Sequence, residues 1–208
     1  MIQGLYAITP SGLEENDLLS KTEVLLKEGI KLIQYRDKIL DKKTFQEKAH
    51  ALLKLTKKYG AKLVINDHVE ICLEISADGF HLGLEDYSSE GNVDLLKKNK
   101  EFISKNLICG LSCKWNKELV VNPPENEIKW TYLAVGSFYP SNTKSTIPET
   151  NESVKRKFLS YTDKPLVAIG GINKKNIGEV RSLGYSCFAL SEALFENPQN
   201  VLNEYKRL

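Results

Sequence analysis

Residues 32 to 38 read Leu32-Ile33-Gln34-Tyr35-Arg36-Asp37-Lys38, a short apolar run that ends abruptly in amide and charged side chains. The same change from apolar to polar occurs at three further places, within residues 63–68, 79–86 and 134–144. A short apolar run is typical of a buried strand, and its polar end marks where the strand leaves the core. Because the carboxyl ends of parallel strands face one crevice, we expect the four polar clusters to converge there.

Strand-like and helix-like segments alternate along the whole chain. The expected strands are 4–8, 31–34, 62–65, 79–82, 107–111, 130–135, 166–169 and 187–190. The expected helices are 17–28, 43–59, 69–75, 93–104, 153–160, 176–183 and 192–207, with Pro198 interrupting the last one. Eight strands separated by helices predict an α/β fold, a (β/α)8 TIM barrel formed by residues 1–208 as a single domain. An open doubly wound sheet is the alternative, but the glycine-rich dinucleotide-binding fingerprint does not follow the first strand.

Two segments depart from the regular pattern. Asn122-Pro123-Pro124 cannot continue a helix, so the helix between the fifth and sixth strands should be short or irregular. Residues 137–149 are rich in Ser, Thr, Asn and Pro and follow the sixth strand. A long loop at that face of a barrel is a candidate lid.

The composition limits the classes of partner. The chain has 208 residues, is 27% charged and has a net charge of +2, which does not favour nucleic-acid binding. It contains neither a long apolar stretch nor an N-terminal signal pattern. The four scattered cysteines suit a reducing compartment. We therefore expect a cytoplasmic protein that binds neither nucleic acid nor membrane, and the sequence leaves open whether it forms a homo-oligomer.

The polar cluster after the second strand combines an amide with two cations. Gln34, Arg36 and Lys38 alternate, so on an extended backbone they point one way and the residues between them point the other way. Arg can grip two phosphate oxygens and Lys adds a point charge, a combination that suits a diphosphate. The alternative is an ordinary solvated strand end.

Asp67 and Asp86 follow neighbouring expected strands. Asp67 could bind a metal, or it could cap the helix expected from Val69, as Asp commonly does. Two carboxylates together with phosphate oxygens form the hard oxygen ligand set that Mg²⁺ prefers. Their joint presence beside the basic cluster favours the metal.

Structural roles explain His68 and His81 at least as well as acid–base roles do, and Ser112 is not expected to act as a nucleophile. His81 lies inside an apolar run, and His68 heads an expected helix. Ser112 lacks the His and acid partners in sequence that a nucleophile would need.

The ends of the last two strands suggest a second anion site. Gly170-Gly171 ends the seventh strand and Leu190-Ser191 ends the eighth. Loops after these two strands form the usual phosphate site of a barrel, and glycine permits a close approach of the backbone to the anion.

The chain resembles the thiamine-phosphate synthase family from end to end. The matching motifs are residues 4–9 (GLYAIT), 34–38 (QYRDK), 66–67 (ND), 77–83 (ADGFHLG), 85–86 (ED), 110–112 (GLS), 136–144 (GSFYPSNTK) and 169–172 (IGGI). The resemblance implies a (β/α)8 barrel that condenses a hydroxymethylpyrimidine diphosphate with a thiazole phosphate, giving thiamine phosphate and pyrophosphate.

The resemblance also assigns roles to individual residues. It implies that the pyrimidine diphosphate is held by Gln34, Tyr35, Arg36, Asp37, Lys38, Asn66 and Lys144, with Ser112 on the pyrimidine amine. It implies one Mg²⁺ on Asp67 and Asp86, and Arg36, Lys38 and Lys144 as the charges that act on the leaving pyrophosphate. The thiazole phosphate would take Ser141, Asn142, Thr143, Gly171, Leu190 and Ser191.

Two alternatives share the barrel. A related thiazole tautomerase, an isomerase, typically lacks the Asn66-Asp67 pair and carries a His after the fifth strand, where this chain has Ser112-Cys113-Lys114. A non-catalytic barrel that binds thiamine precursors would need the loss of a metal or pyrophosphate residue, and none is visibly lost.

Overall fold

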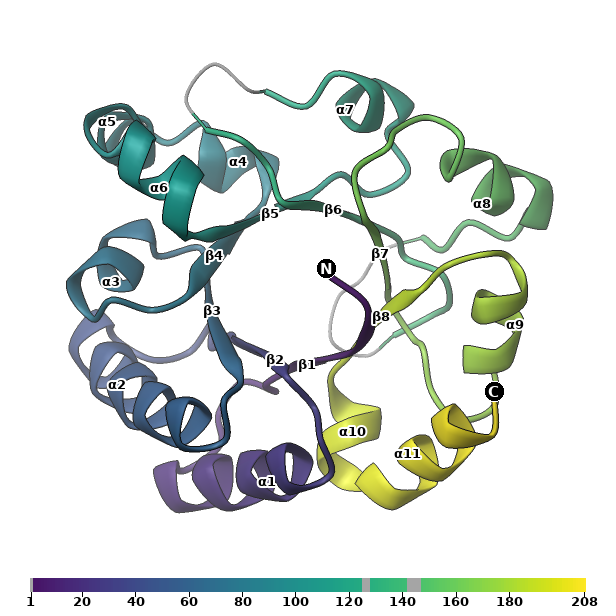
Figure 1. The fold of residues 1–208 in the computed structure, drawn as a ribbon, viewed down its shortest axis with the longest axis horizontal. Coiled ribbons are helices and arrows are strands. Elements are labelled where there is room, and N and C mark those ends of the chain that lie inside the picture. The colour runs from purple at the N-terminus through teal and green to yellow at the C-terminus, as the bar shows by residue number, and fades with distance from the viewer. Residues whose placement is uncertain (1, 125–127, 142–146) are drawn as a thin grey trace.

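Eight parallel strands close into a barrel in the computed structural model, which describes residues 2–124, 128–141 and 147–208. Figure 1 looks down this ring, with the helices around its outside. The strands are β1 (Gly4–Ile8), β2 (Leu32–Tyr35), β3 (Lys62–Asn66), β4 (Gly79–Leu82), β5 (Ile108–Ser112), β6 (Tyr132–Val135), β7 (Leu166–Ile169) and β8 (Cys187–Leu190). The predicted (β/α)8 barrel is therefore confirmed, and each predicted strand is present to within one or two residues.

Strand alternation divides the core into two layers. β1 pairs with β8 to close the ring, with Leu5 beside Phe188 and Tyr6 beside Ala189. Leu5 and Phe188 belong to the larger cluster between strands and helices, whereas Tyr6 and Ala189 belong to a smaller cluster inside the barrel. A side chain's place on its strand therefore decides whether it packs against a helix or faces the inside of the barrel.

The helices cover the outside of the ring. They are α1 (Glu15–Lys27), α2 (Lys42–Lys58), α3 (Val69–Glu74), α4 (Leu84–Tyr87), α5 (Glu90–Lys98), α6 (Lys100–Asn106), α7 (Lys117–Val121), α8 (Glu152–Phe158), α9 (Ile177–Ser182), α10 (Glu192–Glu196) and α11 (Pro198–Arg207). The longest, α2, is capped by Asp41, whose carboxylate accepts hydrogen bonds from the backbone of Lys43 and Thr44. It buries Phe45 and Leu52 against the strands.

Three helix predictions can be compared directly with the structure. The single helix predicted over 93–104 is wrong, because the chain breaks at Asn99 (φ −111°, ψ 13°) between α5 and α6. The side chain of Asn99 donates to the carbonyl of Leu95, a local bond that competes with a continuous helix. The predicted interruption at Pro198 and the short helix before β6 (α7) are both confirmed.

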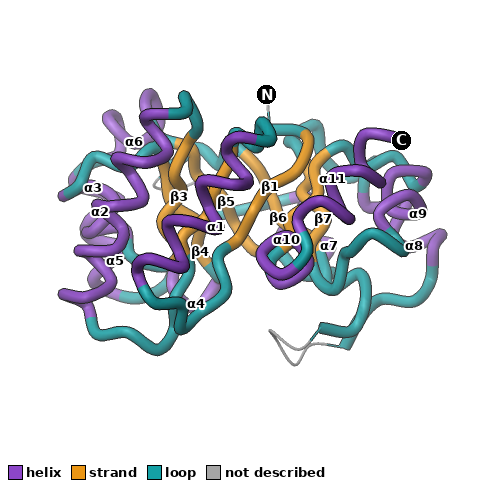
Figure 2. The backbone as a smooth tube through the Cα atoms, turned by 90° about the horizontal axis from the view of Figure 1, so that it is seen from below, coloured by secondary structure: helices purple, strands orange, loops and turns teal. Residues whose placement is uncertain are grey.

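The ends of the barrel differ. In Figure 2, α4, which follows β4, lies at one end of the barrel, and the N-terminus lies at the opposite end. The end marked by α4 is that of the carboxyl ends of the strands, where the predicted polar clusters meet. Among the described residues, no helix is both long and apolar enough to cross a membrane.

Candidate active site

The loop after β1 holds the end of β2. The Thr9 hydroxyl accepts from the backbone N–H of Arg36 (2.9 Å) and donates to the Arg36 carbonyl (3.0 Å). The Ser11 hydroxyl accepts from the Arg36 guanidinium (3.4 Å) and from the backbone N–H of Lys38 (3.2 Å). The backbone that carries the Arg36 and Lys38 side chains is therefore fixed by hydrogen bonds to the loop after β1.

Tyr35 and Asp37 do not join this cation group. The Tyr35 ring is buried against Phe45 of α2, with ring centres 4.4 Å apart. The Asp37 carboxylate accepts from the backbone N–H groups of Gly12 and Ile39, each at 2.9 Å, and so ties two loops together. Tyr35 points away from the cations as predicted, but β2 ends at Tyr35 and Asp37 lines the same cleft as Lys38, so the predicted alternation does not extend to residue 37. A direct contact of Tyr35 or Asp37 with substrate stays a prediction.

Asp67 does not cap α3, because the N-cap of that helix is His68. Its carboxylate instead forms an ion pair with Lys38 and accepts from the Asn66 amide at 2.6 Å. Its φ of 65° lies in the left-handed region, which costs free energy for any residue other than glycine. The strained backbone and the paired carboxylate both favour the metal interpretation over the capping one.

Asp86 lies in α4, beside Asp67. Burial raises the pKa of Asp86 above its ordinary value, the negative charge of Asp67 raises it further, and the Lys38 ammonium opposes the shift. Two apposed carboxylates of this kind gain from a shared divalent cation, and their oxygens are the ligands that Mg²⁺ prefers. The donor set therefore fits Mg²⁺.

The protein alone supplies few metal ligands. Within residues 2–124, 128–141 and 147–208, the structure contains no group of three or more His, Cys, Asp or Glu side chains that could hold a metal ion. Mg²⁺ commonly binds one or two carboxylates and takes its remaining ligands from water and substrate phosphates. Asp67 and Asp86 match that pattern.

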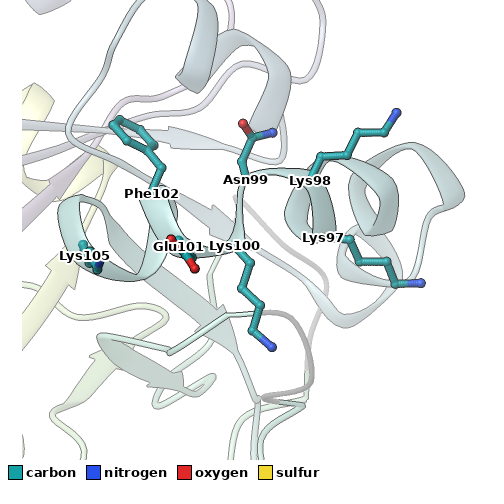
Figure 3. A pocket seen from close by; sticks show the side chains of 7 residues that line it. All are labelled: Lys97, Lys98, Asn99, Lys100, Glu101, Phe102 and Lys105. Atoms are coloured by element: carbon teal, nitrogen blue, oxygen red, sulfur yellow. The ribbon is translucent and has the colours of Figure 1, made fainter.

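A cleft of about 570 Å³ opens over these residues. Its lining includes Asp37, Lys38, Asp67, His68 and Asp86. Another hollow, of about 600 Å³, lies at the α5–α6 junction on the outside of the barrel and is lined by residues between Lys97 and Lys105. Figure 3 shows Lys98 and Lys100 there pointing away from each other, so this hollow lacks the converging groups of the cleft.

At the opposite side of the mouth, the β7 end packs against the loop that follows β6. A Cβ on Gly171 would lie 2.3 Å from the Pro140 carbonyl oxygen, and a Cβ on Gly170 would lie 2.1 Å from the Ser137 hydroxyl. The φ of Gly171 is 63°, again a conformation that favours glycine. Ser141 directly follows Pro140, so two predicted parts of the thiazole-phosphate site, Ser141 and Gly171, lie side by side.

Leu190 and Ser191 complete this side. Ile169 of β7 pairs with Ala189 of β8, which places the ends of the two strands next to each other. The Leu190 side chain is buried in the outer cluster, so only its backbone is available to a ligand at this end of the barrel. The Ser191 hydroxyl oxygen is buried and has no hydrogen-bond partner among the described residues, which suits a site for an anion.

The remaining predicted site residues lie at other places. Ser112 ends β5 and is on the inner face of that strand, as Gly110 is, because Cys109 and Leu111, which alternate with these two residues, pack in the outer cluster. Asn142, Thr143 and Lys144 lie outside the described residues.

Thr9 and Ser11 were not predicted as site residues. The turn Thr9-Pro10-Ser11-Gly12 directly after the first strand was the available signal, because it places two hydroxyls at the same end of the barrel as the polar clusters.

The family whose sequence pattern matches this chain is described as thiamine monophosphate synthase, and the match covers residues 5–194. The chain belongs to this family. It is 36% identical to a thiamine-phosphate synthase of Nitrosospira multiformis over 195 residues, which are 93% of this chain and 79% of that protein. It is 31% identical to a thiamine-phosphate synthase of Methanobrevibacter smithii over 208 residues, which are 97% of this chain and 95% of that protein.

A solved structure of this family has a similar fold. The thiamine phosphate pyrophosphorylase of Pyrococcus furiosus superposes with a TM-score of 0.78 at 29% identity, covering 99% of this chain and 94% of that one. The family predicted from the sequence motifs is thus confirmed, and the protein is a transferase of thiamine biosynthesis.

Proposed function

We propose that this protein condenses 4-amino-2-methyl-5-(diphosphooxymethyl)pyrimidine with 4-methyl-5-(2-phosphoethyl)thiazole, or its carboxylated form, to give thiamine phosphate and pyrophosphate. One observation carries the proposal beyond family membership. Lys38 meets Asp67 and Asp86 in a cleft at one side of the barrel mouth, and Arg36 follows the end of β2 beside it. The glycine-lined ends of β7 and β8 at the other side offer a second, uncharged candidate for an anion site. Two phosphorylated substrates need two such sites.

Arg36 and Lys38 bind the diphosphate in this proposal, together with Gln34, Asn66 and Lys144. The Ser11 hydroxyl accepts from the Arg36 guanidinium and from the backbone N–H of Lys38 before substrate arrives, which reduces the cost of ordering the Arg36 side chain and the Lys38 backbone on binding. The Lys38 side chain is half-exposed, so it can move from Asp67 to a diphosphate oxygen.

Asp67 and Asp86 would hold one Mg²⁺. When bound there, the ion would offset the negative charge of the diphosphate. Asn66 donates to Asp67 and so holds that carboxylate in the orientation it has in the cleft.

The chemistry needs no protein nucleophile. The bond between the exocyclic CH2 and the diphosphate oxygen breaks, pyrophosphate leaves with the electron pair, and a pyrimidine cation remains. The lone pair of the thiazole nitrogen then forms the new C–N bond. Negative charge grows on the leaving pyrophosphate, so Arg36, Lys38 and Lys144 stabilise the transition state electrostatically.

The rest of the site positions the second substrate. The thiazole phosphate binds to Ser141, Asn142, Thr143 and Gly171 and to the backbone of Leu190 and Ser191, while Ser112 contacts the pyrimidine amine. Holding the thiazole nitrogen near the cation is a positioning task. Residues 137–149 would exclude water, which would otherwise trap the cation.

No feature of the described site favours the tautomerase. Asp67 lines the cleft and accepts a hydrogen bond from Asn66, and Ser112-Cys113-Lys114 stands at the end of β5 in place of the His of that isomerase. We expect the enzyme to act in the cytoplasm on these small molecules, and homo-oligomer formation stays a prediction.

The test is thiamine phosphate formation by the purified protein from the two substrates, with Mg²⁺ and with excess EDTA. We expect thiamine phosphate and pyrophosphate in equal amounts with Mg²⁺, and none with EDTA. Absence of product under both conditions would refute the proposed reaction, whereas equal product under both would refute only the metal assignment.

A further inference from the structure

Two lysines occupy positions on the buried faces of their helices. Lys48 lies in α2 and Lys155 lies in α8, and the two residues are 7% and 5% exposed. On α2, Lys48 comes three positions after the buried Phe45 and four before the buried Leu52, which is the spacing of one helix face. On α8, the buried Phe158 comes three positions after Lys155. An apolar side chain is the ordinary occupant of such positions, because a lysine is rarely buried without a partner.

Both ammonium groups donate to backbone carbonyls. Nζ of Lys48 lies 2.8 Å from the Leu13 oxygen, and Nζ of Lys155 lies 3.2 Å from the Phe138 oxygen. Nζ of Lys155 also lies 5.4 Å and 5.0 Å from the ring centres of Phe138 and Tyr139, which are cation–π distances. Within residues 2–124, 128–141 and 147–208, neither lysine forms an ion pair with a carboxylate.

Packing alone does not explain a buried ammonium. Removing the charge of Lys48 or Lys155 from water costs free energy, and an apolar side chain of similar size would fill the same space at a lower cost. What each lysine supplies, and an apolar residue cannot, is a donor for a loop carbonyl at the carboxyl ends of the strands.

Lys48 holds the loop that supports the charged strand end. Its acceptor, Leu13, comes two residues after Ser11, whose hydroxyl accepts from the Arg36 guanidinium and from the backbone N–H of Lys38. The loop after β1 is therefore bonded to α2 through Leu13 and to the end of β2 through Ser11. A shift of this loop would displace the groups that bind the diphosphate in the proposed function.

Lys155 holds the loop that packs against the end of β7. The backbone N–H of its acceptor residue, Phe138, donates to the Ile169 carbonyl, and the N–H of Tyr139 donates to the Gly170 carbonyl, each at 3.0 Å. The segment after β6 is therefore bonded to α8 on one side and to β7 on the other. Figure 1 shows α2 and α8 on opposite sides of the ring, so each lysine serves a different side of the barrel mouth.

We propose that Lys48 and Lys155 are positioning residues, Lys48 for the diphosphate site and Lys155 for the thiazole-phosphate site. Both are buried, so each acts through the loop whose carbonyl it binds and does not touch the substrate. This inference rests on the proposed function, because it assigns each lysine to one substrate of that reaction.

The first test needs no activity. Lys48→Met and Lys155→Met keep an unbranched side chain but remove the donor and the charge, and each variant is the control for the other. Amide hydrogen exchange reports on each loop through the N–H of Gly12, which donates to the Asp37 carboxylate, and that of Tyr139. We expect Lys155→Met to speed exchange at Tyr139 about tenfold and leave Gly12 unchanged, and Lys48→Met to do the reverse.

Equal acceleration of both amides in either variant, or no acceleration, would overturn the proposal. Where a methionine variant does not fold, the glutamine variant at that position, whose amide nitrogen is one bond closer to the backbone than Nζ, is measured with the same expectation.

The second test separates the two substrates by steady-state kinetics. We expect Lys155→Met to raise the KM for the thiazole phosphate about tenfold, with kcat and the KM for the pyrimidine diphosphate nearly unchanged. Lys48→Met should raise the KM for the pyrimidine diphosphate and lower kcat, because the loop that it loosens supports Arg36 and Lys38. The same change in both KM values in both variants would overturn the assignment of one lysine to each site. If the wild type makes no thiamine phosphate, the proposed function fails, and hydrogen exchange alone decides whether the lysines position their loops.

Discussion

The two sides of the barrel mouth present different chemical groups. At the ends of β2, β3 and β4, charged side chains meet in the cleft, with Lys38 on Asp67 and Asp86 beside them. At the ends of β7 and β8, Gly171 lies against the Pro140 carbonyl, and the Ser191 hydroxyl is the buried polar group. In the proposed function, the first side recognises an anion with side-chain charge, and the second does so with backbone shape.

This difference predicts different responses to mutation. Two carboxylates that face each other in a cleft repel each other, so removing the charge of one should harm function more than stability. A glycine at a close backbone contact serves both the fold and the site, so replacing it should harm both. Substitutions at Asp86, Gly171 and Ser191 test this contrast, and one at Asp41 provides a reference outside both sides.

The largest effect should come from Asp86→Asn on the charged side. Because burial and the charge of Asp67 disfavour the ionised form of Asp86, an amide there should leave the thermal midpoint at pH 7 equal or higher. Turnover with Mg²⁺ should fall by about 10²-fold, as it does when a preorganised electrostatic contact is lost. Steady-state kinetics at limiting Mg²⁺ together with thermal melts measure both, and full activity would show that Asp86 holds no metal.

On the backbone side, Gly171→Ala should destabilise the fold. Its Cβ would lie 2.3 Å from the Pro140 carbonyl oxygen. Gly60→Ala is a matched control, because Gly60 has a φ of 60° against 63° for Gly171 but has nothing within 4 Å of the added Cβ. We expect a cost of about 1 kcal/mol at Gly60 from backbone strain, and about 2 kcal/mol more at Gly171. Urea denaturation compares the two, and equal costs would mean that the close contact at Gly171 is unimportant.

The sequence predicted the charged side better than the backbone side, for a physical reason. Arg36, Lys38, Asp67 and Asp86 carry their chemistry in their side chains and follow apolar runs, so their position at strand ends could be read directly. The direction of Tyr35 away from Arg36 was also predictable, because strand alternation decides it.

Contacts between segments that lie far apart in the sequence could not be predicted from strand ends and alternation. The packing of Gly171 on Pro140 depends on how two loops meet, and the hydrogen bond between Tyr6 and Tyr132 joins residues 126 positions apart. The capping alternative for Asp67 was excluded only by the structure, in which His68 is the N-cap of α3. The break at Asn99 was missed because its side chain competes locally with a helix that the periodicity favoured.

A smaller effect is expected from Ser191→Ala. The variant removes a buried hydroxyl that lacks a partner among the described residues, so stability should be unchanged or slightly higher. If the hydroxyl binds the thiazole phosphate, the KM for that substrate should rise by about tenfold, as for one hydrogen bond to a charged group. Thr22→Val is the control, because its hydroxyl is also buried without a described partner but lies on α1. An unchanged KM in Ser191→Ala would exclude Ser191 from the site.

The smallest effect concerns Asp41, a carboxylate outside both sites with the opposite pKa shift. Hydrogen bonds from Thr44 and Lys43 hold the pKa of Asp41 below its ordinary value of about 3.9. Asp41 therefore stabilises the fold above that pH, and its contribution is lost as the pH falls through the lowered pKa. The urea midpoint of Asp41→Ala should be lower than that of the wild type at pH 7, and the gap should close near pH 2. An equal gap at both pH values would contradict the carboxylate cap, and Asp41→Asn, which cannot titrate, serves as the control.

The most direct test of two separate anion sites is isothermal titration of the wild type and Asp86→Asn with each ligand alone. The ligands are pyrophosphate with Mg²⁺, and 4-methyl-5-(2-phosphoethyl)thiazole. We predict that Asp86→Asn weakens binding of magnesium pyrophosphate by about tenfold or more, because it loses a carboxylate ligand, and leaves binding of the thiazole phosphate unchanged. Equal weakening of both ligands would contradict the division of the barrel mouth into a charged side and a backbone side.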